Sequence, residues 1–252
     1  ELDSEGTLTI SGKGDMDVWE YSSRVAWSSY DSDIVSVVIE EGVTSIGNYA
    51  FYDCESLTSI TIPDSVTSIG EESFQFCDSL TSVTIPDSVT SIGYGAFWSC
   101  DNLISVNIPD GVTAISDYTF YYCKKLASVT IPDGVTSIGE YAFAGCYGLT
   151  SITIPDSVTT IGDYVFGYCK SLTSITIPDG VTSIGEYAFY ECESLTSVTI
   201  SGSDTSIGEE AFRYCDSLIA INIDSKNKYY ASEDGVLFNK DKSQLIRFPE
   251  AK

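Results

Sequence analysis

The sequence predicts an α/β repeat fold: one elongated solenoid of short parallel strands and short helices, capped at both ends. The first observation is the spacing of the eight cysteines, each of which stands 23 residues after the last. A fixed period of about twenty to fifty residues is typical of solenoids, in which each coil buries its apolar face against its neighbours. The second observation is that whole columns of the repeat hold one apolar residue type. Phenylalanine occupies Phe51, Phe74, Phe97, Phe120, Phe143, Phe166, Phe189 and Phe212.

We number the coils 1 to 8 by their cysteine, from Cys54 to Cys215. Around Ile60 apolar and polar residues alternate, which predicts a short strand with one buried face, one such strand per coil. Val66 and Ile69 are three residues apart and predict a second extended piece with a bend. Other apolar residues have the spacing i, i+1, i+4 and i+7, which predicts a short helix held by packing. In coil 1 these residues are Ala50, Phe51, Cys54 and Leu57.

A Pro-Asp-Ser or Pro-Asp-Gly turn joins the two extended pieces in most coils. Proline fixes φ, and aspartate bonds the backbone ahead of it. The aspartates of these turns are Asp64, Asp87, Asp110, Asp133, Asp156 and Asp179. A column of carboxylates could also bind calcium, but calcium prefers about six to eight oxygen ligands and each coil supplies one Asp here. We therefore expect the aspartates to stabilise turns.

The repeat resembles the BspA-like family of bacterial leucine-rich repeats. Residues 80–86 have the pattern Leu-x-x-Val-x-Ile-Pro, and residues 96–100 have the Ala-Phe-x-x-Cys element of that family. The resemblance covers residues 39–223 in eight tandem copies and implies a right-handed leucine-rich-repeat solenoid. The flanks resemble the family's N-terminal cap at 1–38 and its C-terminal cap hairpin at 224–252, all within one continuous domain.

Departures from the repeat are local. Ser116 stands where other coils have glycine, and Asp204 stands where they have valine. Ser201 and Asp224 replace the proline near the end of the stack, as a cap would require.

The charge of the chain excludes two classes of partner. It has 37 acidic and 12 basic residues, a formal net charge of −25. Nucleic acid and anionic membrane surfaces are therefore poor partners. No stretch approaches the roughly 18 apolar residues of a membrane helix, so we expect no membrane insertion. The chain opens at Glu1 without a signal peptide, as a mature protein or an excised piece would. The family resemblance implies secretion or cell-surface display.

The cysteine column has three interpretations. Stacked thiols lie within disulfide range, but side chains in register point the same way, which is poor geometry for a bond. Zinc would need converging Cys or His ligands, and the chain has no histidine. We expect buried, reduced thiols that pack as small apolar residues.

The absence of histidine also argues against an enzyme. No Ser-His-Asp or Cys-His arrangement is possible, and the commonest general base is missing. A carboxylate pair for glycoside hydrolysis should break the repeat, whereas the acids mostly follow it. We expect no catalysis and no cofactor.

Two groups of residues are candidates for a binding site. Aromatic residues that the repeat does not require fall in adjacent coils, and they indicate a patch for protein or sugar, unless they only shield the coil edges. They are Phe76, Tyr94, Trp98, Tyr121 and Tyr122, with Tyr147, Tyr168 and Tyr190 farther along. The outward strand positions form a hydroxyl ladder that could bind a partner surface, or could simply suit an exposed strand. It includes Ser82, Thr84, Ser128, Thr130, Ser151 and Thr153.

These features favour a secreted or surface-attached binding module. The resemblance implies adhesion to host matrix proteins, host cells or bacterial surfaces. The alternatives are a carbohydrate-attachment accessory module of a polysaccharide-degrading assembly, which binds glycan, and a passive spacer between other domains.

Overall fold

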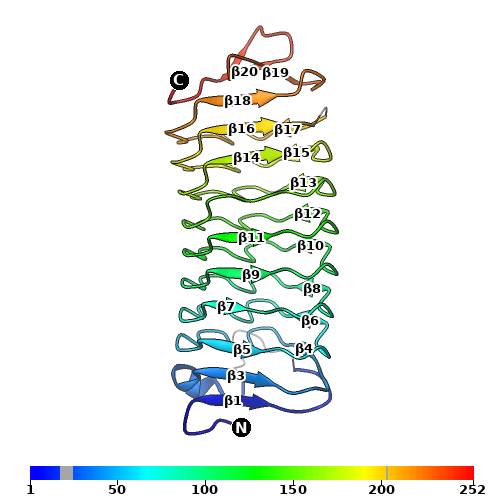
Figure 1. Ribbon diagram of the computed structural model, residues 1–252, viewed down its shortest axis with the longest axis vertical. Coiled ribbons are helices and arrows are strands. Elements are labelled where there is room, and N and C mark those ends of the chain that lie inside the picture. The colour runs from blue at the N-terminus through cyan, green and yellow to red at the C-terminus, as the bar shows by residue number, and fades with distance from the viewer. Residues whose placement is uncertain (18–24, 203) are drawn as a thin grey trace.

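The computed structural model describes residues 1–17, 25–202 and 204–252. The coils stack in one column with the two ends of the chain at opposite ends of the stack (Figure 1). Strands of successive coils pair in parallel and in register, for example Val83 with Val106 and Ile138 with Ile161. The predicted parallel-strand solenoid of about eight turns is therefore confirmed. Its handedness stays a prediction.

The first row of strands comes from the alternating segments. It forms three parallel sheets, β1-β3-β5, β7-β9-β11 and β14-β16-β18. The bounds are β1 Thr7–Ile10, β3 Ser36–Ile39, β5 Ser59–Thr61, β7 Ser82–Val83, β9 Ser105–Asn107, β11 Ser128–Thr130, β14 Ser174–Ile177, β16 Ser197–Ile200 and β18 Ala220–Ile223. A single bridge between Thr130 and Thr153 continues the row at coil 5. We call the outward surface of this row the strand face.

Each coil also contributes a second strand, so the expectation of one strand per coil was too low. This second row forms the sheets β2-β4-β6-β8 and β10-β12-β13-β15-β17. The bounds are β2 Gly14–Asp15, β4 Val43–Ile46, β6 Ser68–Ile69, β8 Ser91–Ile92, β10 Ala114–Ile115, β12 Ser137–Ile138, β13 Thr160–Ile161, β15 Ser183–Ile184 and β17 Ser206–Ile207. The row is interrupted between β8 and β10.

Ser116 explains this interruption. In coils 2, 3 and 5 to 8 a glycine follows the second strand and lies so close to the preceding coil that a side chain would collide with it. A Cβ on Gly162 would stand 2.6 Å from the backbone nitrogen of Glu140. The Gly162 N–H donates to the Ile138 carbonyl at 2.9 Å. At Ser116 the hydroxyl instead donates to the Ile92 carbonyl at 2.7 Å.

The prediction of short helices in the repeats is wrong. Over the described residues the helical structure is the 3-10 helix η1, Ser28–Asp33, which precedes the repeats. The segment predicted as a helix is a chain of turns in every coil. In coil 1, Tyr49 and Asp53 have positive φ angles of 56° and 63°. The intervening Phe51 donates its N–H to the Ser73 carbonyl of the next coil at 2.8 Å.

A helix would need right-handed φ throughout and hydrogen bonds within the segment. Here alternate N–H groups bond the neighbouring coil instead, which makes a third row of contacts between coils. The helix-like spacing arose because the turns point four side chains inward. We call the outward surface of these turns the turn face.

The core is built from the predicted columns. The phenylalanine rings stack along the solenoid with centroids 5.2–5.7 Å apart, and each is at most 3% exposed. All eight cysteines are buried and free, as the sequence predicted. Seven thiols, from Cys77 to Cys215, donate to a phenylalanine carbonyl of an earlier coil at 3.1–3.2 Å. Burial raises the pKa of the thiols, that of Cys215 to about 12.

The end of the stack differs from the prediction in one detail. Asp204 is exposed, and Thr205, which is fully buried, takes the place of the valine. The Thr205 hydroxyl donates to the Val181 carbonyl at 2.6 Å. Threonine has the shape of valine, and its hydroxyl finds an acceptor there. Sequence position alone assigned the valine's role to the wrong neighbour.

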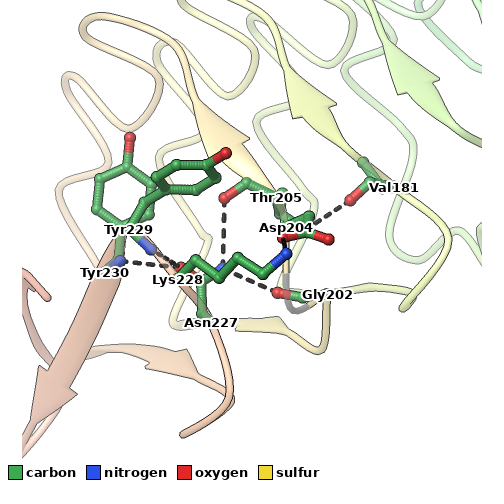
Figure 2. Close-up of polar contacts among 8 residues, drawn as sticks. All are labelled: Val181, Gly202, Asp204, Thr205, Asn227, Lys228, Tyr229 and Tyr230. Carbon is green, nitrogen blue, oxygen red and sulfur yellow. Dashed lines mark hydrogen bonds and ion pairs between the residues drawn. The ribbon is translucent and has the colours of Figure 1, made fainter.

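The C-terminal segment forms the antiparallel sheet β19-β20-β21, with β19 Tyr230–Glu233, β20 Val236–Asn239 and β21 Leu245–Arg247. Figure 2 shows how Asn227 joins it to the last coil. The amide of Asn227 donates to the carbonyls of Gly202 and Thr205, and its oxygen accepts from the N–H groups of Tyr229 and Tyr230. That this segment and residues 1–38 act as caps stays a prediction, and residues 18–24 lie outside the described residues.

Candidate functional site

The turn face brings the five predicted aromatic residues together. The ring of Trp98 lies 6.4 Å from that of Phe76 and 5.3 Å from that of Tyr121. Tyr121 and Tyr122 meet edge to face at 4.5 Å. Tyr94 joins them through Tyr118, whose ring is 5.2 Å from that of Tyr94 and 5.5 Å from that of Trp98. All five side chains are half-buried, so each still offers part of its surface to solvent.

A ladder of tyrosines at the same corner of the coil was missed from the sequence. Tyr118, Tyr141, Tyr164 and Tyr187 stack with their ring centroids 4.8 Å apart and 15°, 6° and 14° between the ring planes. This spacing is the distance between neighbouring strands, so the rings repeat with the coils. The four residues are 23 apart in the sequence, and that spacing was the available signal.

The ring contacts continue along the stack. Tyr147 meets Tyr122 at 6.1 Å, and Tyr168 meets Tyr190 at 5.3 Å. We define the aromatic patch as the residues linked by these contacts. They are Tyr49, Tyr52, Phe76, Tyr94, Trp98, Tyr118, Tyr121, Tyr122, Tyr141, Tyr147, Tyr164, Tyr168, Tyr187, Tyr190 and Tyr214. The patch therefore runs from coil 1 to coil 8.

A column of acidic residues borders the tyrosine ladder. Its members immediately precede the ladder positions and comprise Glu71, Asp117, Glu140, Asp163, Glu186 and Glu209. Asp117 accepts the N–H of Glu140 at 2.8 Å, and Asp163 accepts the N–H of Glu186 at 2.7 Å. Burial, followed by the charge of neighbouring Glu140 and Asp117, raises the pKa of Tyr118 above its ordinary value. Tyr118 thus lies in a negative field, beside the carboxylates of Glu140 and Asp117.

Two basic side chains contact rings of the patch. The guanidinium of Arg213 lies 4.7 Å from the ring centroid of Tyr214 and donates to its hydroxyl at 2.9 Å. Arg213 also pairs with Glu210 at 3.9 Å. The ammonium of Lys170 lies 6.0 Å from the ring centroid of Tyr147. Aromatic faces attract cations at these distances.

The strand face carries the predicted hydroxyl ladder. Ser82, Thr84, Ser128, Thr130, Ser151 and Thr153 are all exposed. The first four line a shallow depression together with Ser105, Asn107, Asp87 and Asp110, whereas Ser151 and Thr153 lie outside its lining. The side chain of Asn107 bonds both backbone groups of Ile85, at 3.0 and 2.8 Å. Because β7 ends at Val83, these two bonds take the place of strand pairing at Ile85.

Within residues 1–17, 25–202 and 204–252, no group of three His, Cys, Asp or Glu side chains is arranged to hold a metal ion. No helix of the described chain is long and apolar enough to cross a membrane. The chemistry that both faces offer is non-covalent contact: ring surfaces, hydroxyls and carboxylates.

Parallel strands, a 23-residue coil and a leucine column define a leucine-rich-repeat solenoid, a class that generally works by binding along its length and is typically non-catalytic. The sequence model of one protein family, the BspA-type leucine-rich-repeat region, matches residues 27–149 and 136–250 in six copies. The chain belongs to this family.

Solved structures of bacterial leucine-rich-repeat proteins are similar to the chain. One from Bacteroides ovatus is 27% identical, with a TM-score of 0.62, over 88% of this chain and 68% of that chain. Another, from T. pallidum, is 29% identical, with a TM-score of 0.54, over 68% of this chain and 86% of that one. No curated protein matches the sequence.

Proposed function

We propose that the chain is a secreted or surface-displayed binding module that engages another protein through the aromatic patch. The observation that carries this proposal is the second layer of aromatic residues. The columns of phenylalanine, leucine, isoleucine, valine and cysteine fill the core, and each phenylalanine ring is at most 3% exposed. The patch is therefore surplus to the core, and its half-buried rings keep contact area for a partner.

Aromatic residues in such a setting are typical of binding surfaces. Tyr and Trp supply large, rigid contact area with a polar group at the edge, and they are enriched where binding energy concentrates. Here contact between rings holds them in place, so little conformational entropy is lost when a partner binds. We place adhesion to host matrix proteins, host cells or bacterial surfaces first among the functions of this module.

Glycan binding is the second candidate, and the depression on the strand face favours it. Its lining combines hydroxyls with the carboxylates of Asp87 and Asp110 and the amide of Asn107. Such groups hydrogen-bond to sugar hydroxyls. A partner that binds only there would make the module an attachment domain for polysaccharide.

A binding panel tests the proposal. Matrix proteins, bacterial cells and glycans are probed with wild type and with Trp98→Ala/Tyr121→Ala. Because both rings lie inside the patch, we expect the double variant to lose about 2 kcal/mol or more of binding free energy. Tyr229→Ala is the matched control, since Tyr229 is 52% exposed and lies outside the patch.

Each outcome has a distinct meaning. Equal binding by wild type and the double variant would refute the choice of site. Glycan binding that depends on Asn107 and not on Trp98 would support the second candidate. No binding in the whole panel would favour a passive spacer. Thermal unfolding of each variant shows whether a loss of binding reflects a loss of fold.

A further inference from the structure

We propose that Trp98 and the tyrosines of the turn face form a relay for one-electron oxidation, which carries a radical from coil 3 to coil 8. The oxidant is a one-electron acceptor in solution that meets Trp98, and the reductant is a one-electron donor in solution that meets Tyr214. This activity goes beyond the proposed binding function, because it needs no partner protein. Its basis is the contact between the rings, the choice of tyrosine, and the state of the thiols.

The rings of the relay are in contact at every step. The ring of Trp98 stacks on that of Tyr118 with the centroids 5.5 Å apart and 27° between the ring planes. From Tyr118 the tyrosine ladder continues at 4.8 Å per coil to Tyr187. The ring of Tyr190 lies 5.8 Å from that of Tyr187 and 5.4 Å from that of Tyr214. Electron transfer between rings slows exponentially with distance, so these contacts give a fast path over about 24 Å, five coil spacings.

Each step moves one electron and one proton. The oxidant takes an electron from Trp98, whose indole N–H bond breaks and gives its proton to water. Tyr118 then passes an electron to the indolyl radical and loses its phenol proton to water, while the indole nitrogen takes a proton back. Both side chains are half-buried, so water reaches them. Trp98 is thereby restored, and Tyr118 carries the phenoxyl radical.

The same exchange then runs along the ladder. Because the donor and the acceptor are both tyrosine, each step has almost no driving force in either direction, and no ring traps the radical. The path ends at Tyr214, which is 42% exposed and is the most exposed ring of the patch. The Arg213 guanidinium donates to its hydroxyl oxygen at 2.9 Å, a bond that the phenoxyl oxygen can still accept. There the reductant supplies an electron and water supplies a proton, which restores the phenol.

The hydroxyl group distinguishes the ladder from the core column. Phenylalanine rings stack through the core at 5.2–5.7 Å, so a ring without a hydroxyl is sufficient for packing between coils. A phenol or an indole gives up an electron far more readily than a benzene ring does. The carboxylates of Glu140 and Asp117 beside Tyr118 also favour the loss of an electron, because negative charge stabilises a ring that becomes positive.

The buried thiols do not divert the radical. The thiolate is the reactive form of cysteine, and burial raises the pKa of Cys100 and Cys123 well above its ordinary value. Each of these thiols holds its proton in a hydrogen bond to a phenylalanine carbonyl at 3.1 Å, where neither side chain is exposed to water. The relay therefore moves oxidation along the surface and away from the core.

Pulse radiolysis of the whole chain with azide radical tests the entry to the relay. Azide radical takes one electron from tryptophan and becomes azide. In the wild type we expect a fast phase in which the absorbance of the indolyl radical converts to that of the phenoxyl radical, at a rate independent of protein concentration. Trp98→Phe should remove this phase, and Tyr118→Phe/Tyr121→Phe should slow it at least about tenfold. Tyr229→Phe lies outside the patch and should leave it unchanged.

A nitroso spin trap with peptide mass spectrometry tests the length of the relay. In the wild type, trap adducts should gather on Tyr214. Tyr141→Phe/Tyr164→Phe/Tyr168→Phe keeps every ring but removes the phenols in the middle of the path. It should lower the adducts on Tyr214 at least about fivefold, while the conversion at Trp98 keeps its wild-type rate.

Two results would overturn the inference. A wild-type rate of conversion in Tyr118→Phe/Tyr121→Phe would show that the radical does not pass through the ring contacts. Unchanged adducts on Tyr214 in the triple variant would show that no radical travels along the ladder. Every substitution keeps the aromatic ring, so the variants should fold. Neither result bears on binding by the patch, which the panel with Trp98→Ala/Tyr121→Ala tests separately.

Discussion

Two glycine-to-serine substitutions in neighbouring coils should change stability in opposite directions. Gly162 follows the second strand of its coil, and Gly134 belongs to a Pro-Asp-Gly turn. Neither has a positive φ, so the side chain and its surroundings decide the result. The pair therefore tests how closely the coils pack at two corners of the same stack.

Gly162→Ser should destabilise the solenoid. Its Cβ would stand 2.6 Å from the Glu140 nitrogen and from the Gly139 carbonyl carbon, both of which are backbone atoms that cannot turn aside. The coils must separate, and the bond from the Gly162 N–H to the Ile138 carbonyl is strained or lost. Overpacking of this kind costs about 1–3 kcal/mol, and we expect about 2. The interruption of the second row at Ser116 is the natural precedent.

Gly134→Ser should stabilise the solenoid by about 1 kcal/mol. Serine stands at the same position in other coils, where Ser65, Ser88 and Ser157 donate to a valine carbonyl of the preceding coil at 2.6–2.7 Å. The new hydroxyl would reach the Val112 carbonyl in the same way, and serine also lowers the entropy of the unfolded chain. The nearest atom to the new Cβ is the Asp110 carbonyl oxygen at 3.2 Å.

Equilibrium unfolding in urea, followed by circular dichroism, measures both effects. At equal m-values the midpoint should fall for Gly162→Ser and rise for Gly134→Ser. An unchanged midpoint for Gly162→Ser, or a lower one for Gly134→Ser, would refute the account of coil spacing. Ser116→Ala is a further control: it keeps the Cβ that this site already holds, so its loss should be limited to the hydrogen bond to Ile92, about 1 kcal/mol.

Three further predictions concern the thiols, alkaline pH and calcium. A thiol reagent should label few of the eight cysteines in the native protein and all of them in denaturant; labelling in denaturant only after reduction would reveal disulfides. The free energy of unfolding should stay constant up to about pH 9 and fall at higher pH. Burial raises the pKa of the thiols above 9.0 and that of Tyr118 above 10.0, so the folded state holds these protons more tightly than the unfolded state does. A melting temperature that is constant up to pH 11 would contradict this. Excess calcium should leave the melting temperature nearly unchanged, since the turn aspartates are exposed and one per coil; a rise of many degrees would demand real calcium sites.

The repeat determined what was predictable from the sequence. The 23-residue period located the strands, the phenylalanine core and the buried thiols, because each depends on contacts that recur in every coil. The helix prediction failed because apolar spacing does not reveal φ: Tyr49 and Asp53 adopt left-handed conformations that side-chain pattern alone disfavours.

Features that depend on local packing were harder to predict. Thr205 is the buried residue where the repeat places the valine one position earlier, at Asp204, and no column of the repeat indicates this. The aromatic candidates were grouped correctly, yet Tyr118, Tyr141, Tyr164 and Tyr187 were overlooked, although their spacing was visible in the sequence. The candidates were aromatic residues that depart from the repeat, whereas these four tyrosines recur with its 23-residue period.

Hydroxyl-radical footprinting of the complex with the partner found in the binding panel tests the central claim most directly. Trp98, Tyr121, Tyr141 and Tyr164 react readily with radicals, and mass spectrometry reports the oxidation of each. We predict that the partner protects these residues and leaves Tyr229, which lies outside the patch, as reactive as in the free protein. Unchanged oxidation of the patch in a saturated complex would contradict the claim that the turn face is the binding surface.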